Sequence, residues 1–138
     1  MPDHESEIIT KARQWLAYAD EDMDLAQYTR THMEGAPLRL IAYHAQQCAE
    51  KCLKAYLVCR SIDFPYTHNI ARLLELSVDT DWSESLQEAE ELSPYAISTR
   101  YPGIDEPVGE PEAIRAIEIA DTVRHAVHAK LAQLGVFD

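Results

Sequence analysis

Three side chains that can bind metal or take part in redox chemistry lie on one predicted helix of this chain. His44, Cys48 and Cys52 follow one another at intervals of four residues. Eight helical residues rise about 12 Å, too far for all three side chains to reach a single ion. With Cys59, the cysteines form an odd set on one helix, as expected of small core side chains in a reducing compartment. We therefore interpret them as core residues.

A second set of possible metal ligands, Asp121, His125 and His128, occupies one face of the last predicted helix. No partner ligands can be identified elsewhere in the sequence. The Glu-x-x-His spacing of di-iron bundles, a Gly-rich phosphate loop and a Gly-x-Ser-x-Gly nucleophile turn do not occur. We predict no metal and no cofactor, and the enzyme classes that such motifs identify are mostly excluded.

Cationic and aromatic side chains suggest an anion site. Lys51 and Lys54 lie on one predicted helix, and Arg100 and Tyr101 come where a later helix gives way to a Pro- and Gly-rich loop. A guanidinium grips phosphate and an aromatic ring stacks on a base, so we predict a phosphate-bearing ligand held by Lys54 and Arg100 with Tyr101 on the base. That loop could close over the ligand.

A structural alternative assigns both lysines to ion pairs, and the end of the later helix to a simple cap. In this interpretation, Lys51 and Lys54 pair with Glu50 or with carboxylates of the first helix such as Asp20 and Asp24. Exposed pairs of this kind contribute about 0.2 to 1 kcal/mol.

Five predicted helices must position these groups. Apolar residues at helical spacing predict long helices over residues 6–32, 36–60, 81–100 and 111–135, and a short one over residues 67–76. No segment has the alternation of a strand. The chain is therefore predicted to be a single domain, residues 1–138, with an all-α fold: an up-and-down four-helix bundle with one short inserted helix.

Local signals set the ends of these helices. Gly35 is a left-handed stop and Pro37 suits the next first turn, which makes the first two helices an antiparallel pair. Thr67 and Asp81 are predicted caps, and Pro94 should bend the helix that Asp81 opens. Helix 36–60 is apolar on more than one side, so its polar groups form a narrow strip: Gln46, Gln47, Glu50, Lys51 and Lys54.

Charge and hydropathy restrict the partners. The formal net charge is −12 at pH 7, so a polyanion would be repelled and non-specific nucleic-acid binding is not expected. No apolar run is long enough to span a bilayer, and the N-terminus has the wrong charge for a signal peptide, which predicts a cytoplasmic protein. Apolar stripes widened by aromatic residues exceed what one small bundle can bury, which predicts a homodimer. The aromatic residues are Trp15, Tyr18, Tyr43 and Tyr56.

Four short motifs in register resemble the HEPN domain family over nearly the whole chain. They are Trp15, the run from His44 to Tyr56, the run Thr67-His68-Asn69-Ile70 with Leu73-Leu74, and the segment from Tyr95 to Pro102. The resemblance implies an up-and-down helical bundle that dimerises through helices. It also implies a place in toxin–antitoxin operons beside a minimal nucleotidyltransferase and, in some members, nucleotide binding. The nucleotide site would then fall on Lys51, Lys54, His68, Arg100 and Tyr101.

Many members of this family are metal-independent ribonucleases, which use an Arg followed four to six residues later by a His in a late helix. Here Arg100 has no His after it until His125. Arg39 and His44 have the spacing but lie in an earlier helix, about 140° apart around its axis. We therefore carry over no catalytic residue. The predicted function is a non-catalytic partner of a nucleotidyltransferase, with an endoribonuclease toxin or a bundle with an unrelated ligand as alternatives.

Overall fold

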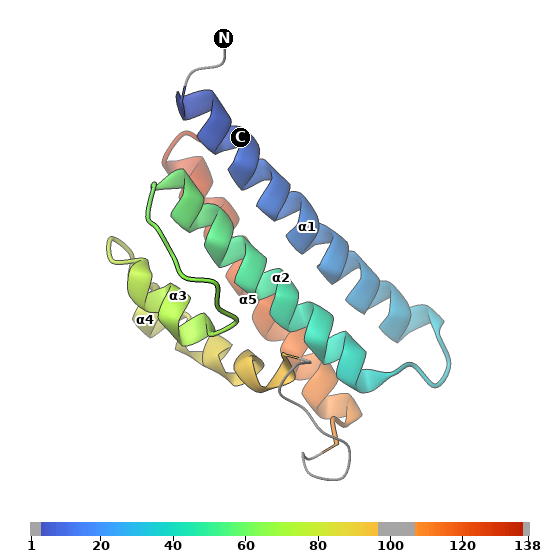
Figure 1. Cartoon of the computed structure of the whole chain (residues 1–138). Helices are drawn as coiled ribbons and strands as arrows, with labels where there is room; N and C mark the ends of the chain where they lie inside the picture. Colours follow the sequence, from blue (N-terminus) through green and yellow to red (C-terminus); the bar gives the residue numbers. More distant parts are fainter. Residues whose placement is uncertain (1–3, 97–106, 137–138) are drawn as a thin grey trace.

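Three long helices form the main body of the protein (Figure 1). The structure is a computed structural model that describes residues 4–96 and 107–136. Helices α1 (His4–His32), α2 (Leu38–Cys59) and α5 (Glu110–Gln133) carry most of the chain. Helix α2 packs against both α1 and α5, whereas α1 and α5 touch each other little. The predicted all-α bundle is confirmed, and α2 is its central helix.

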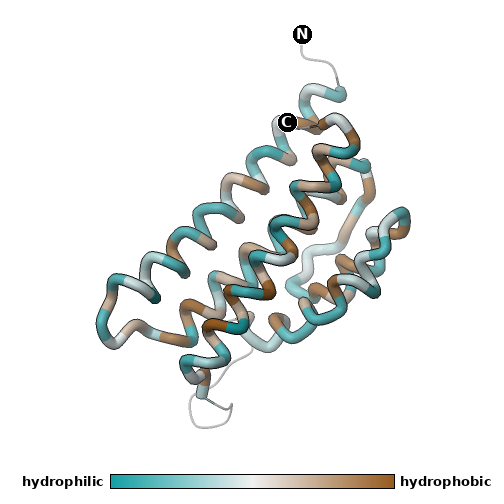
Figure 2. Tube along the Cα trace, turned by 180° about the vertical axis from the view of Figure 1, so that it is seen from behind, coloured by the Kyte–Doolittle hydropathy of each residue, from teal (hydrophilic) through white to brown (hydrophobic). Residues whose placement is uncertain are grey.

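The sequence explains the central place of α2. Its small and apolar side chains are buried around most of its circumference, including Ala45, Cys48, Cys52 and Leu57. The predicted core role of Cys48 and Cys52 is confirmed, and the cysteines in the described residues are unpaired thiols. Figure 2 shows hydrophobic positions recurring along each long helix between hydrophilic ones, the pattern of helices that bury one face.

The connection from α1 to α2 follows its predicted chemistry. Gly35 has a φ of +68°, the left-handed conformation that glycine adopts without strain. Pro37 precedes α2 directly, and its carbonyl accepts hydrogen bonds from Leu40 and Ile41. The short turn makes α1 and α2 antiparallel neighbours, as expected.

The prediction of one long helix over residues 81–100 is wrong. Its place is taken by a single α-helical turn, α4 (Trp82–Ser85), and a 3₁₀ segment, η1 (Gln87–Tyr95). Pro94 lacks the N–H that an α-helix would need there, and the tighter 3₁₀ geometry accommodates it near the end of the segment. Residues 97–100 lie outside the described residues.

The predicted caps also need correction. The side chain of Asp81 accepts no capping hydrogen bond from the backbone N–H groups of α4. The short helix α3 (Ile70–Leu76) is capped by Asn69, whose Oδ1 accepts from the backbone N–H of Arg72, while Thr67 Oγ1 accepts from the N–H of Asn69.

Replacing Asn69 with alanine should therefore cost about 1 kcal/mol in the free energy of unfolding, because the N–H of Arg72 loses its acceptor. Urea denaturation measures this cost. Asp81→Ala is the matched control, since no capping bond is lost there; an equal cost at both positions would contradict the assignment of the cap.

Candidate functional site

The polar strip predicted on α2 faces the protein interior. Gln46, Gln47, Glu50 and Lys54 are all buried, and only Lys51 is half-exposed. A buried charge is costly unless it is paired and hydrogen-bonded. These side chains must therefore satisfy one another, and their contacts form two clusters.

Glu50 is the centre of the first cluster. Its Oε1 accepts hydrogen bonds from Gln46 Nε2 at 2.9 Å and from His68 Nδ1 at 2.8 Å. Its Oε2 accepts from Lys54 Nζ at 3.0 Å. Gln47 Nε2 donates to Gln46 Oε1 at 2.8 Å and extends the chain of hydrogen bonds. Since a carboxylate only accepts, the proton of His68 faces Glu50 on Nδ1.

Three aromatic rings complete the surroundings of Lys54. Its Nζ lies 5.5 Å from the ring centroid of Trp15, 5.7 Å from that of Phe64 and 5.9 Å from that of Tyr66. The negative faces of aromatic rings attract an ammonium group, most strongly where water is excluded. Lys54 is thus held by Glu50 on one side and by rings from α1 and the connection before α3.

Asp22 of α1 is the centre of the second cluster. Its Oδ1 lies 2.8 Å from His44 Nδ1 and its Oδ2 lies 2.6 Å from Lys51 Nζ. Lys51 also lies 6.0 Å from the ring centroid of Tyr18. This cluster joins α1 to α2 by a charged contact at the edge of their apolar seam.

The structural alternative, in which both lysines form ion pairs within the chain, thus agrees with the structure. Glu50 is the partner of Lys54, as that alternative proposed, but the partner of Lys51 is Asp22 rather than Asp20 or Asp24. Asp20 pairs instead with Arg124 of α5 at 2.7 Å. The sequence contained one signal for this: Asp22 falls within the buried stripe of α1, next to the polar strip of α2.

The predicted nucleotide residues lie in different places. Lys54 and His68 meet at Glu50, and Lys51 belongs to the second cluster. Arg100 and Tyr101 lie outside the described residues. A phosphate that used Lys54 would have to displace the Glu50 carboxylate and enter between the rings. Of the predicted nucleotide residues that the structure describes, Lys51 and His68 are the two that are partly exposed to an anion.

Each cluster pairs a histidine with a carboxylate, a geometry that orients an imidazole in many enzymes. Here, Nδ1 of both His44 and His68 is engaged. Arg39, the possible ribonuclease partner of His44, is exposed on α2. Each cation in the two clusters has a carboxylate partner. The Asp22 cluster ties α1 to α2, and the Glu50 cluster ties α2 to the connection before α3.

Among the described residues, no group of three or more His, Cys, Asp or Glu side chains is arranged to hold a metal ion. His125 Nδ1 lies 2.9 Å from the backbone carbonyl oxygen of Asp121, one turn earlier. His128 Nε2 is buried without a hydrogen-bond partner. Burial lowers the pKa of His128 below the ordinary histidine value of 6.5, and Arg124 lowers it further.

This depressed pKa predicts acid sensitivity. The unfolded chain binds a proton at His128 more readily than the folded one, so the stabilising contribution is complete above about pH 6.5 and is lost as the pH falls below it. Melting temperatures between about pH 7.5 and about pH 5.5 should fall less in His128→Gln than in the wild type. His125→Gln on the same helix is the control, and equal slopes in all three proteins would refute the prediction.

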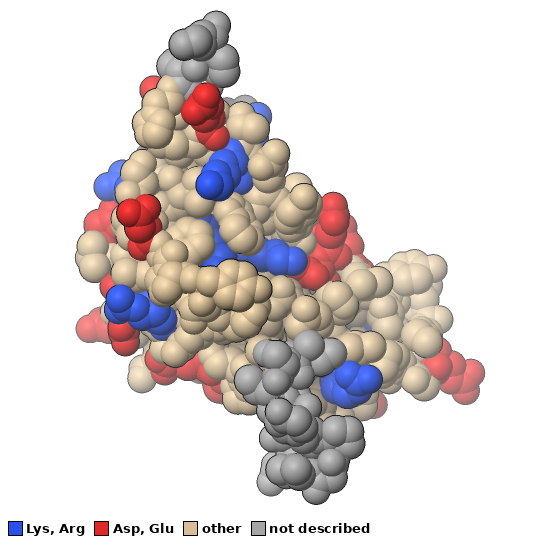
Figure 3. All heavy atoms as spheres, in the orientation of Figure 1, with Lys and Arg blue, Asp and Glu red and all other residues tan. Residues whose placement is uncertain are grey.

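Within the part of the chain that the structure describes, no helix has the length and apolar character needed to cross a membrane. Basic side chains on the face in Figure 3 form separate patches beside acidic ones and do not merge into one basic surface. This face therefore offers no continuous track for a polyanion.

Comparison with known proteins identifies the fold. A family model described as HEPN domain matches residues 12–130. A search of curated proteins found no match. Two solved structures are similar along almost their whole length. One is ST0689, an archaeal HEPN homologue, with a TM-score of 0.71, 26% identity and coverage of 87% of this chain and 97% of that one. The other is TT1696 from Thermus thermophilus, with a TM-score of 0.67, 30% identity and coverage of 88% and 98%. The chain therefore belongs to the HEPN domain family.

Proposed function

We propose that this HEPN domain is a non-catalytic interaction module that forms a homodimer and binds a minimal nucleotidyltransferase in a toxin–antitoxin-type pair. The observation that carries the proposal is the internal pairing of the cations in the two clusters: Lys51, Lys54 and His44 of α2, and His68 before α3, each contact a carboxylate of the same chain. Side chains engaged in this way stabilise the fold and leave the outer helical faces to make contacts with other proteins.

The same observation disfavours the ribonuclease alternative. A metal-independent ribonuclease needs a histidine as general base and an arginine on the scissile phosphate. Incubation with single-stranded or transfer RNA should therefore give no cleavage. Cleavage that disappears in Arg39→Ala or His44→Ala would make the α2 pair a catalytic site and overturn the proposal.

The dimer proposal is supported by the N-terminal half of α1. Tyr18 is exposed, Trp15 is half-buried, and both line a shallow apolar pocket with Lys11 and Gln14. Tyr56, which the sequence suggested for the interface, is instead buried in the protein's own core. Sedimentation equilibrium at micromolar concentration should give the mass of two chains, and a clean monomer would reject the dimer.

Nucleotide binding remains a second proposal, supported by the partial exposure of the His68 and Lys51 side chains. Titration calorimetry with ATP, GTP and AMP tests it. Binding that Arg100→Ala weakens about tenfold would support the predicted site. No heat from any of the three, or binding indifferent to Arg100 and Lys51, would reject it.

The partnership is tested directly: where the gene beside this one encodes a minimal nucleotidyltransferase, that protein is mixed with the chain. Size-exclusion chromatography with light scattering should show a complex heavier than either protein alone. Separate elution of the two proteins at micromolar concentrations, or the absence of such a neighbouring gene, would reject the partnership.

A further inference from the structure

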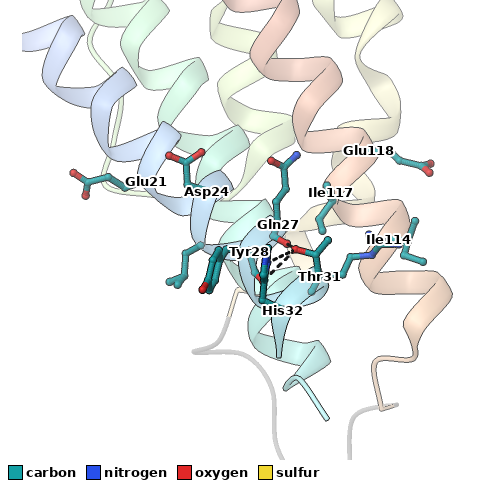
Figure 4. Close-up of a pocket in the computed structure, with 11 residues that line it drawn as sticks. Glu21, Asp24, Gln27, Tyr28, Thr31, His32, Ile114, Ile117 and Glu118 are labelled. Atoms are coloured by element: carbon teal, nitrogen blue, oxygen red, sulfur yellow. Dashed lines mark hydrogen bonds between the residues drawn. The ribbon is translucent and has the colours of Figure 1, made fainter. Parts of the chain in front are cut away.

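An open groove of about 1010 Å³ lies between the C-terminal half of α1 and the N-terminal half of α5 (Figure 4). It exists because the two helices pack against α2 and hardly touch each other. None of the side chains in the two α2 clusters lines it. The groove is therefore separate from the candidate site described above.

Apolar side chains line the groove from both helices, and the polar Gln27 and Thr31 lie between them. Leu25 and Tyr28 of α1 are 50% and 64% exposed, and Ile114 and Ile117 of α5 are half-buried on the opposite side. The Tyr28 ring stacks on His32 with centroids 4.2 Å apart, which holds it in place. Neighbouring exposed apolar side chains of this kind are typical of a surface that a partner covers.

The edges of the groove are acidic. Figure 4 shows Glu21 on the α1 side and Glu118 on the α5 side, with Tyr28 and Ile117 between them. Asp24 also lines the groove, and the guanidinium in its lining belongs to Arg30. Three carboxylates against one guanidinium favour a cationic occupant.

The charge also argues against a second copy of the chain in this place. Two copies that met groove to groove would bring their carboxylate edges together, and each carries a formal charge of −12. An amphipathic helix with an apolar face and lysine or arginine at its borders matches both the apolar side chains and the carboxylates of the groove.

We propose that the α1–α5 groove binds a cationic amphipathic helix of a partner protein. This inference deepens the proposed function, because it gives the chemistry of the surface that the partner must present. It rests on the proposed function only for the identity of that partner.

A labelled helical peptide of about 18 residues, with leucine on one face and lysine on the other, is a suitable probe. Fluorescence anisotropy with the whole chain should show saturable binding. Leu25→Ser with Tyr28→Ala should weaken it about tenfold, because the apolar contacts are lost. Glu21→Lys with Glu118→Lys should weaken peptide binding by a similar factor, and both positions are exposed, so no buried residue is changed.

Matched variants separate the groove from general acidity. Glu84→Lys with Glu90→Lys changes the net charge equally at exposed positions outside the groove, and Val78→Ser removes an exposed apolar side chain elsewhere. Both should bind as the wild type does. Equal weakening by the groove and control charge variants, or no weakening by either groove variant, would overturn the inference. If the groove variants change the sedimentation mass of the chain itself, the occupant is a second copy and the inference also fails.

Failure of this inference can be told apart from failure of the proposed function. A nucleotidyltransferase that binds all groove variants equally well would leave the partnership intact and reject the groove. If the groove binds the cationic peptide but the chain binds no nucleotidyltransferase, the groove inference stands and the proposed partnership is rejected.

Discussion

Replacing Glu50 with methionine should lower the free energy of unfolding by about 3 to 5 kcal/mol, because Lys54 is left as a buried charge without its carboxylate. Only 3% of the Glu50 side chain and 6% of the Lys54 side chain are exposed. His68 and Gln46 lose their acceptor in the same step. Urea denaturation measures the loss.

The double variant Glu50→Met, Lys54→Met tests the cause. Removing both charges should recover most of the stability lost in Glu50→Met, because no unpaired charge stays buried. Glu75→Met is the matched control, since Glu75 and its partner Arg72 are both exposed and the variant should unfold almost as the wild type does. A double variant no more stable than Glu50→Met would show that the carboxylate stabilises the fold in another way.

Trp82→Ala should lower the free energy of unfolding by a comparable amount, about 3 to 5 kcal/mol. Trp82 is 4% exposed, and its ring meets Tyr56 edge-on with centroids 4.6 Å apart. Because α4 is one turn long and lacks a side-chain cap, this buried indole attaches it to α2.

The expected readout is a lower melting temperature, with a weaker near-ultraviolet circular dichroism signal in the folded state because the Trp82–Tyr56 ring contact is missing. Val78→Ala, at an exposed position close by in the chain, is the control and should have little effect. A small effect of Trp82→Ala would mean that other contacts hold this region, such as the hydrogen bond that Tyr56 Oη donates to Asp79, just before α4, at 2.5 Å.

The long helices could be predicted from sequence because their signals are periodic and local. In α1, α2 and α5 the apolar spacing, the Gly35 stop and the Pro residues near the helix starts all agree. The region around Pro94 could not be predicted in the same way. Its apolar residues have helical spacing, but a 3₁₀ segment buries Ala89 and Leu92 equally well and tolerates the proline.

The polar residues of the site could be found from sequence, but their partners could not. The narrow strip on α2 was visible as a break in an apolar pattern. Whether Lys54 faces a ligand or Glu50 depends on side-chain direction, and the approach of His68 depends on the path of the connection before α3. Both depend on the tertiary structure, which helical periodicity alone does not determine.

If the Glu50–Lys54 cluster stabilises the fold and the partner binds elsewhere, removing both charges should leave partner binding intact. Calorimetric titration of the minimal nucleotidyltransferase proposed as the partner into the folded Glu50→Met, Lys54→Met variant measures this. We predict a dissociation constant within about twofold of the wild-type value, since the two side chains are buried. Loss of binding in a variant that keeps the wild-type fold would contradict this division of roles and make the cluster part of the functional site.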